Sequence, residues 1–264
     1  MIKLGLLGNN ISKSEMPNFI TKLGNEFDFE IKYELFDQAL KINFNFKNLL
    51  RQIKEKNISG INVTYPFKEV VLEHSIKLSE ETKLVKSTNL ILINESMTSY
   101  NTDYSGFLNT YKFNFNKEPS KLVILGGGGV GKSVCFALLK LGVKELYIIE
   151  KDHIKLEKLI EDLKKQHEQV YSINLGELIE NQYEFDGLKL NSNQWSFDVV
   201  YTPAMTTFLK NSENSGAKII TGIDLFLFQG IESFIIFTEQ EKLRKKIMSN
   251  YNNIRKYYFK KLIT

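Results

Sequence analysis

Two polar clusters in the first half of the chain carry residue types that can bind a polyol and move a proton. Residues 60–68 read GINVTYPFK, so a short apolar strand ends at Thr64, a proline blocks its extension, and Lys68 follows directly. An amide, a hydroxyl and an ammonium group are therefore expected together at one strand end, within reach of a bound hydroxyl or carbonyl. The second cluster, at residues 100–106, reads YNTDYSG and adds the carboxylate of Asp103.

A glycine-rich segment in the middle of the chain predicts a phosphate-binding loop. Residues 126–133 read GGGGVGKS, which matches G-x-G-x-x-G, the dinucleotide fingerprint, and equally G-x-x-x-x-G-K-S, the phosphate loop of NTPases. Both motifs place backbone N–H groups and a helix N-terminus against phosphates. The residues around the loop must therefore decide between the two motifs.

A dinucleotide fold needs an acidic residue at the end of the next strand, where it binds ribose hydroxyls. Glu150 directly follows the apolar run at residues 146–149 and meets this requirement. An NTPase needs an apolar strand that ends in a magnesium-binding aspartate, and the run before Asp224 is interrupted by Gly222. The dinucleotide interpretation is therefore favoured, with Lys132 as a solvated or phosphate-facing residue. An NTPase loop and a glycine turn without a ligand are the alternatives.

Short apolar runs alternate with stretches of helical periodicity through most of the chain, which predicts an α/β fold. Strands are expected at residues 2–7, 31–36, 60–63, 89–93, 122–125, 145–149, 197–201 and 218–221. Helices are expected at residues 17–25, 46–56, 67–74, 130–141 and 155–166, and from residue 229 to the end. The strands after residue 121 are expected in one sheet, so the glycine loop belongs to a second unit of the fold.

The two polar clusters, the glycine loop and their order along the chain resemble the shikimate dehydrogenase family, whose patterns run roughly G-x-N-V-T-x-P-x-K and N-T-D-x-x-G. The resemblance implies a substrate domain at residues 1–104, completed by C-terminal helices at residues 229–264. It implies a doubly wound, Rossmann-type dinucleotide-binding domain at residues 105–228. The implied activity is the reversible NAD(P)-dependent reduction of 3-dehydroshikimate to shikimate, a step of aromatic amino-acid and chorismate biosynthesis, in the cleft between the domains.

The same resemblance assigns roles to individual residues. Proton transfer falls to Lys68 and Asp103, since an ammonium can protonate a carbonyl oxygen while a carboxylate orients it. The residues implied to bind substrate are Ser14, Thr64, Asn89, Tyr201 and Gln229. The residues implied to bind the cofactor are Gly126, Gly127, Gly128, Gly129, Val130, Glu150, Lys151, Val199 and Gly222.

The N-terminal loop departs from the family pattern G-N-P-I-x-H-S-x-S-P. Residues 8–17 read GNNISKSEMP, which keeps the first serine as Ser14 but replaces the second with Met16, a side chain that cannot donate a hydrogen bond. Lys13 stands where the family has histidine. Quinate or another cyclic polyol acid is therefore an alternative substrate. Ser14 is also placed to cap a helix that Pro17 helps to start.

The cofactor domain departs from the family pattern at two places. NADP-binding members carry N-R-T after the second strand, and Glu150, Lys151 and Asp152 stand there instead. A carboxylate at this point repels a 2′-phosphate and favours NAD, while the ammonium of Lys151 lacks the planar fork of arginine, so NADP and NAD both stay open. The block N-A-T-P-x-G-M is missing between Val170 and Phe197, which leaves a catalytically impaired, ligand-binding paralogue as a further alternative.

Composition excludes several other classes of protein. The net charge of +4, from 35 basic and 31 acidic residues, suits an anionic small molecule better than nucleic acid. A single cysteine allows no internal disulfide and predicts a cytoplasmic setting. Apolar runs stay well short of the roughly 18 residues of a membrane span, and the three histidines have no metal-ligand spacing. We expect no metal, no nucleic-acid partner, no membrane contact, and a monomer or homodimer.

Overall fold

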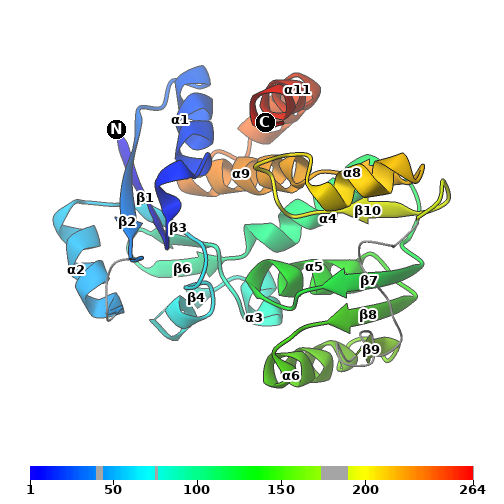
Figure 1. The fold of residues 1–264 in the computed structure, drawn as a ribbon. Coiled ribbons are helices and arrows are strands. Elements are labelled where there is room, and N and C mark those ends of the chain that lie inside the picture. The colour runs from blue at the N-terminus through cyan, green and yellow to red at the C-terminus, as the bar shows by residue number, and fades with distance from the viewer. Residues whose placement is uncertain (40–43, 75–76, 174–189, 264) are drawn as a thin grey trace. The chain divides into compact units, whose positions relative to one another are not determined.

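The computed structural model describes residues 1–39, 44–74, 77–173 and 190–263 (Figure 1). The chain forms two compact units, which are described separately below. Unit 1 comprises Met1–Ser105 and Gln229–Ser249, and unit 2 comprises Gly106–Phe228 and Asn250–Thr264. Of the three boundaries between the units, two fall within the helices α4 (Thr102–Asn114) and α9 (Gly222–Thr238), and the third lies between Ser249 and Asn250. None of the described helices is both long and apolar enough to cross a membrane.

Unit 1 is built on one mixed sheet. Its strands, in spatial order, are β2 (Ile31–Asp37), β1 (Ile2–Gly8), β3 (Gly60–Val63), β5 (Leu90–Ile93), β6 (Met97–Tyr100) and β4 (Lys77–Leu78). Strand β1 is parallel to both β2 and β3, whereas β5 is antiparallel to β3 and β6. The C-terminal ends of β1 and β3 therefore point the same way, and the polar segments that follow these two strands start from one edge of the sheet.

Helices cover the sheet of unit 1 because their apolar faces pack against its apolar side chains. They are η1 (Ile11–Lys13), α1 (Met16–Glu26), α2 (Phe46–Glu55), η2 (Val70–His74), α3 (Glu80–Val85) and α10 (Leu243–Ser249), with the unit 1 parts of α4 and α9. In α2, Phe46, Leu49 and Ile53 recur at helical spacing and join a buried core that includes Phe36 and Ile61 of the sheet. This core holds β3 in place and thereby fixes the polar turn that follows it.

Unit 2 has the βα alternation of a Rossmann-type fold. Strands β7 (Lys121–Leu125), β8 (Glu145–Ile149) and β9 (Val170–Ser172) run parallel in that order, and Figure 1 shows them side by side. Strands β10 (Trp195–Phe197) and β11 (Lys218–Ile220) form a separate parallel pair. The described helices that lie wholly in this unit are α5 (Gly129–Lys140), α6 (His153–Lys164), α8 (Thr207–Asn214) and α11 (Tyr251–Leu262).

The later strands of unit 2 differ from the sequence-based expectation. Among the described residues, no ladder of hydrogen bonds joins β10 or β11 to β7, so the predicted single sheet is present as two pieces. The strand predicted at residues 197–201 ends at Phe197. The carboxylate of Asp198 explains this end, because it accepts hydrogen bonds from the backbone N–H of Val200 at 3.0 Å and from the hydroxyl of Thr206 at 2.8 Å. The side chain thus turns the backbone away from a strand.

The C-terminal helix α11 groups with unit 2, although the sequence placed all of residues 229–264 with the first domain. The fully buried carboxylate of Asp224 accounts for this grouping. It accepts hydrogen bonds from Arg255 at 2.6 and 3.0 Å and from the Tyr251 hydroxyl at 2.9 Å. Burial and the Asp224 charge raise the pKa of Tyr251, and the hydrogen bond to Asp224 raises the pKa of Arg255. Asp224 therefore ties α11 to the start of α9.

Candidate active site

The two residues to which proton transfer was assigned form an ion pair. Lys68 follows the end of β3, Asp103 lies in the first turn of α4, and the Lys68 ammonium binds the Asp103 carboxylate. The Asp103 residue is only 1% exposed, and the Lys68 side chain is 13% exposed. The Lys68 carbonyl also accepts a hydrogen bond from the Thr88 N–H at 2.8 Å, which fixes the backbone of the lysine. A paired, oriented ammonium of this kind can exchange a proton with an oxygen bound beside it.

A second polar group in unit 1 joins residues from three segments. The Thr102 N–H donates to Oδ1 of Asn89 at 2.7 Å. Nδ2 of Asn89 donates to the Thr102 hydroxyl at 2.9 Å and to Oε1 of Gln229, in α9, at 3.0 Å. The structure thus brings Asn89 and Gln229, both predicted to bind substrate, into direct contact. Thr102 precedes Asp103 in the chain, so this polar group is joined covalently to the ion pair.

The N-terminal loop is held by a residue that the sequence analysis did not single out. Asp37, at the end of β2, accepts hydrogen bonds from the N–H groups of Asn10 and Ile11 at 3.1 and 3.0 Å. The backbone hydrogen bond from Ala39 lowers the pKa of Asp37 most, burial raises it, and the bonds from Ile11 and Asn10 lower it further. The pKa of Asp37 therefore lies below its ordinary value. The loop then forms η1 and ends at Ser14, whose hydroxyl accepts from the N–H of Met16 at 3.4 Å. The N-cap of α1 is Glu15, without a side-chain capping hydrogen bond, so Ser14 contacts the helix start but is not the cap expected from the sequence.

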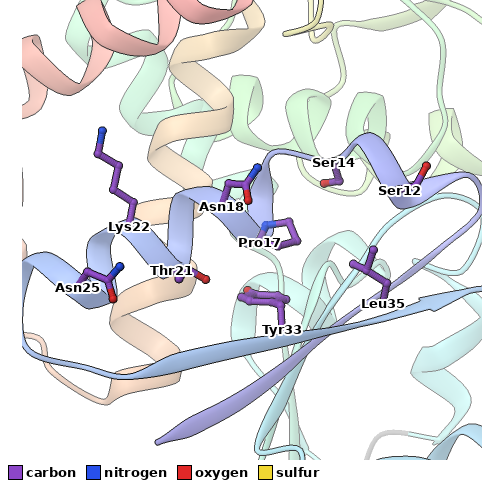
Figure 2. A pocket seen from close by; sticks show the side chains of 9 residues that line it. All are labelled: Ser12, Ser14, Pro17, Asn18, Thr21, Lys22, Asn25, Tyr33 and Leu35. Atoms are coloured by element: carbon purple, nitrogen blue, oxygen red, sulfur yellow. The ribbon is translucent and has the colours of Figure 1, made fainter.

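A pocket of about 490 Å³ lies beside this loop, between η1, α1 and β2 (Figure 2). Its lining consists of Ser12, Ser14, Pro17, Asn18, Thr21, Lys22, Asn25, Tyr33 and Leu35. Of the substrate-binding residues predicted from the sequence, Ser14 borders this pocket, whereas the ion pair of Lys68 and Asp103 is not part of the described lining. The pocket is therefore distinct from the place where proton transfer is expected.

The remaining predicted substrate contacts lie at the end of β3 and in unit 2. Thr64 is half-buried and begins the turn after β3, where its N–H donates to the Leu7 carbonyl at 2.8 Å. In unit 2, the ring of Tyr201 stacks on Phe226 with centroids 4.6 Å apart. The stacking fixes the ring of Tyr201 within its own unit.

The glycine loop of unit 2 has the backbone geometry of a phosphate-binding turn. Gly126 has a φ of 98°, and a Cβ on Gly131 would lie 2.0 Å from the Gly126 carbonyl oxygen, so both positions require glycine. Helix α5 starts at Gly129 with Gly128 as its N-cap, and Val130 follows in its first turn. Free N–H groups at such a helix start bind phosphate oxygens, so the residues present fit a dinucleotide.

Glu150, at the end of β8, faces the glycine loop. Its carboxylate accepts hydrogen bonds from the N–H of Gly127 at 2.7 Å and from the N–H of Asp152 at 3.1 Å. Burial raises the pKa of Glu150, but the backbone N–H groups of Gly127, Asp152 and Lys151 outweigh burial, so the pKa lies below its ordinary value. A fixed negative charge therefore stands beside the loop at neutral pH, with the exposed Lys151 next to it in sequence.

Val199 and Gly222, two of the residues implied to bind the cofactor, are neighbours in unit 2. A Cβ on Gly222 would lie 2.5 Å from the carbonyl oxygen of Val199, so only glycine allows this close approach of the two chain segments. Val199 itself is 42% exposed, which leaves its side chain accessible.

The NTPase interpretation is not supported by the structure. Asp224, the candidate magnesium ligand, is occupied by Arg255 and Tyr251. Lys132 was expected to be solvated or to face phosphate, but it is 7% exposed, so the solvated alternative is wrong. Burial on α5, which packs as a core helix, accounts for the difference. Within the described ranges, no cluster of histidine, cysteine or acidic side chains is arranged to hold a metal ion.

Comparisons with known proteins give the family. Residues 6–91 match the family model described as the shikimate dehydrogenase substrate binding domain. The chain is 30% identical over 270 residues to the shikimate dehydrogenase (NADP(+)) of Clostridium beijerinckii, a match that covers 94% of this chain and 97% of that relative. The chain belongs to the shikimate dehydrogenase family. The shikimate dehydrogenase (NADP(+)) of Caldicellulosiruptor bescii is 28% identical over 262 residues, covering 90% of this chain and 89% of that relative.

Solved structures of this family agree with the fold. A shikimate dehydrogenase from Aquifex aeolicus has a TM-score of 0.75 at 26% identity, over 90% of this chain and 92% of the other. A quinate dehydrogenase from Corynebacterium glutamicum in complex with NAD has a TM-score of 0.80 at 24% identity, over 94% and 99% of the two chains. The predicted α/β class with a Rossmann-type unit is therefore confirmed. Residues 174–189, most of the segment that lacks the N-A-T-P-x-G-M block, lie outside the described residues.

Three polar residues near the family motifs were not assigned individual roles from the sequence. Asn62, inside the N-V-T motif, accepts a hydrogen bond from the Tyr33 hydroxyl at 2.7 Å and donates one to Ser233 Oγ at 3.3 Å. Ser233 Oγ lies 3.4 Å from the Thr102 hydroxyl. Asn62 and Thr102 stand within quoted motifs, so their position was a usable signal. Ser233 has only its place one helical turn after Gln229 to mark it.

Proposed function

We propose that this chain is an NAD(P)-dependent oxidoreductase that reversibly reduces 3-dehydroshikimate to shikimate. The observation that carries the proposal is the buried ion pair of Lys68 and Asp103 at the end of β3. It supplies the proton donor that ketone reduction requires. Family membership, and curated relatives named shikimate dehydrogenase (NADP(+)), support the same activity.

In the direction of reduction, the carbonyl carbon receives a hydride and the carbonyl oxygen receives a proton. The nicotinamide, when bound, supplies the hydride. Nζ of Lys68 gives the proton, while Asp103 holds the ammonium in position through the ion pair. In the direction of oxidation, the neutral amine of Lys68 takes the proton back from the alcohol. Lys68 thus exchanges the proton with the substrate oxygen in both directions of the reaction.

The substrate is a cyclic acid with several hydroxyl groups, and unit 1 presents matching polar groups. Ser14 is proposed to bind the carboxylate, and Thr64 and Gln229 the ring oxygens, with Asn89 holding Gln229 in position. Asn89 and Gln229 are already hydrogen-bonded to each other at 3.0 Å, so they would act as one unit. A hydroxyl-rich ligand matches such a cluster because each ring oxygen can both donate and accept a hydrogen bond.

The glycine loop and the start of α5 are proposed to bind the pyrophosphate of the cofactor through the N–H groups of residues 128–130, because the N–H of Gly126 already donates to Ile149 and that of Gly127 to Glu150. The carboxylate of Glu150 is proposed to accept the adenosine ribose hydroxyls and to repel a 2′-phosphate. We therefore propose that NAD is the better cofactor of this chain, although the curated relatives quoted above are named for NADP(+).

The test is the absorbance of reduced nicotinamide when purified protein is mixed with shikimate and either NAD or NADP. We expect the absorbance to rise with both cofactors and faster with NAD. The variant Lys68→Ala should give no rise on the same time scale. A folded wild-type protein that produces no reduced cofactor from shikimate would overturn the proposed activity.

A second candidate substrate is quinate, and the observation that favours it is Met16. This residue replaces the second carboxylate-binding serine, is 8% exposed, and lies beside Gly230 of α9. The loss of one hydrogen-bond donor weakens selection for the acid group that two serines would hold, so a carboxylate placed differently can be accepted. The ratio of kcat/KM for shikimate and quinate decides between the two, and a ratio below one would assign the chain to quinate.

A further inference from the structure

The hydrogen bonds of Thr102 determine how the Asn89 amide is oriented. A backbone N–H can only donate, so the Asn89 atom that lies 2.7 Å from the Thr102 N–H must be the oxygen Oδ1. The other end of the amide, Nδ2, is then fixed as well. Its two N–H groups face the Thr102 hydroxyl at 2.9 Å and Oε1 of Gln229 at 3.0 Å. Both donors of Asn89 are therefore used.

The orientation of Asn89 passes to Gln229. Because a donor of Asn89 faces it, the near atom of Gln229 is its oxygen, and the NH2 group is turned away. Among the residues that the structure describes, Nε2 of Gln229 has no hydrogen-bond partner, and Gln229 is only half-buried. Asn89 and Thr102 are 3% and 1% exposed. Of the three residues, Gln229 is thus the one that can offer a donor to a ligand.

Ser233 holds this arrangement from the side of α9. Its hydroxyl donates to the Gln229 carbonyl at 2.8 Å, one turn earlier in the helix, and lies 3.4 Å from the Thr102 hydroxyl. The Ser233 side chain is fully buried and also accepts from Asn62 in the N-V-T motif. The backbone of Gln229 is therefore positioned by the same contacts that orient its amide.

We propose that Thr102 is a positioning residue of the substrate site: its backbone N–H sets which way the Asn89 amide faces, and its hydroxyl holds the Asn89 NH2 group in place. Asn89 thereby keeps the Gln229 NH2 group turned outward as the donor to a substrate oxygen. Thr102 is too deeply buried to touch the substrate itself. The inference rests on the proposed function, because it names which atom of Gln229 meets the ring oxygens. The Gln229 NH2 group would then favour a substrate with an acceptor oxygen at this position over one whose group there can only donate a hydrogen bond.

The test compares Thr102→Val with Thr102→Ser. Valine keeps the shape and the backbone N–H but removes the hydroxyl, which leaves one buried N–H of Asn89 without an acceptor. We expect the KM for shikimate to rise about tenfold, the effect of one lost hydrogen bond, with the KM for the cofactor unchanged. Serine keeps the hydroxyl and should restore the shikimate KM to within about threefold of wild type.

Amide-proton exchange and a second variant, Gln229→Glu, test the role of Thr102 further. Side-chain amide protons of Asn89, followed by NMR, should exchange slowly in wild type and Thr102→Ser and fast in Thr102→Val, whether or not the protein is active. If Thr102→Val does not fold, Gln229→Glu replaces the NH2 donor by an oxygen at equal size and should raise the shikimate KM at least tenfold. An active wild type in which Thr102→Val or Gln229→Glu leaves the shikimate KM unchanged overturns the inference. A wild type without turnover defeats the proposed function, and the amide exchange still decides the role of Thr102.

Discussion

The carboxylate of Glu150 and the backbone N–H of Gly127 lie 2.7 Å apart, which links the end of β8 to the glycine loop. This contact fixes a negative charge at the loop. Because N–H groups hold that charge, and the pKa of Glu150 is lowered, the carboxylate stays ionised at neutral pH. Under the proposed function, this side chain would discriminate between NAD and NADP, which leads to two predictions.

The first concerns Glu150→Gln, which keeps an oxygen that can accept from Gly127 but removes the charge. We expect the ratio of kcat/KM for NADP to that for NAD to rise about tenfold, which corresponds to the loss of about 1.4 kcal/mol of repulsion. Steady-state kinetics with both cofactors measure it. Asp152→Asn is the matched control, since Asp152 caps α6 through the N–H of Lys155 at 3.1 Å. A ratio that moves equally in both variants would contradict the role given to Glu150.

The second concerns pH. A carboxyl group whose pKa is lowered in the folded protein contributes stability above its unfolded pKa, and this contribution is lost as the pH falls through the folded value. The Glu150 charge should therefore persist across neutral pH and disappear only in acid, below the ordinary pKa of a glutamate. We expect the preference for NAD, measured as Kd by calorimetry, to be constant between about pH 7.5 and pH 9, where the 2′-phosphate of NADP is also fully ionised. A preference that falls within this range would show that another group controls it.

Variants of the buried ion pair of Lys68 and Asp103 should lose activity together but differ in how much stability they lose. Asp103→Asn keeps the shape of the side chain but removes the charge that orients Lys68, so kcat should fall about 100-fold or more. The Lys68 ammonium that it leaves unpaired is more exposed than the Asp103 carboxylate, so the loss in free energy of unfolding should be smaller than for Lys68→Ala. Lys68→Ala leaves the Asp103 carboxylate buried and unpaired, which should cost about 3 kcal/mol in addition to activity. Lys83→Ala, which breaks an exposed pair with Glu80, is the control and should cost less than about 1 kcal/mol.

The carboxylate of Asp37, which holds the N-terminal loop, should influence the affinity for substrate without contacting the reacting oxygen. Asp37→Ala removes the acceptor for the N–H groups of Asn10 and Ile11, and the loop that carries Ser14 loses its anchor. We expect the KM for shikimate to rise several-fold, roughly the effect of one or two lost hydrogen bonds, with the KM for the cofactor unchanged. Glu34→Gln, another change on β2, affects only a surface pair with Lys56 and should leave both constants as they are.

The parts of the fold and site that the sequence predicted are those encoded locally. Lys68 and Asp103 stand at the ends of short, periodic elements inside recognisable motifs, so their contact could be expected before it was seen. The glycine pattern likewise encodes its turn, because Gly126 and Gly131 meet backbone requirements that other residues cannot. Periodicity also located most of the strands and helices.

What the sequence did not predict depends on contacts between distant residues. Asn89 and Gln229 are 140 positions apart, and their hydrogen bond follows from the packing of α9 beside β5 in unit 1, which no local pattern specifies. The strand expected at residues 197–201 had the apolar composition of a strand, yet the side chain of Asp198 competes for its backbone. Arg255 reads as one more charge on a polar helix, because its partner lies 31 residues earlier.

The contact between Asp224 and Arg255 leads to the last prediction. Arg255→Met keeps the apolar length of the side chain but leaves the fully buried carboxylate of Asp224 with only the Tyr251 hydroxyl. An unpaired buried charge is costly, so the free energy of unfolding should fall by about 3 kcal/mol, as measured with urea. The double variant Asp224→Asn/Arg255→Met removes the charge as well and should recover at least half of the loss. If the double variant is less stable than Arg255→Met alone, the carboxylate is not destabilising by itself, and the attachment of α11 must depend instead on its aromatic contacts, such as the stacking of Phe228 on Tyr251.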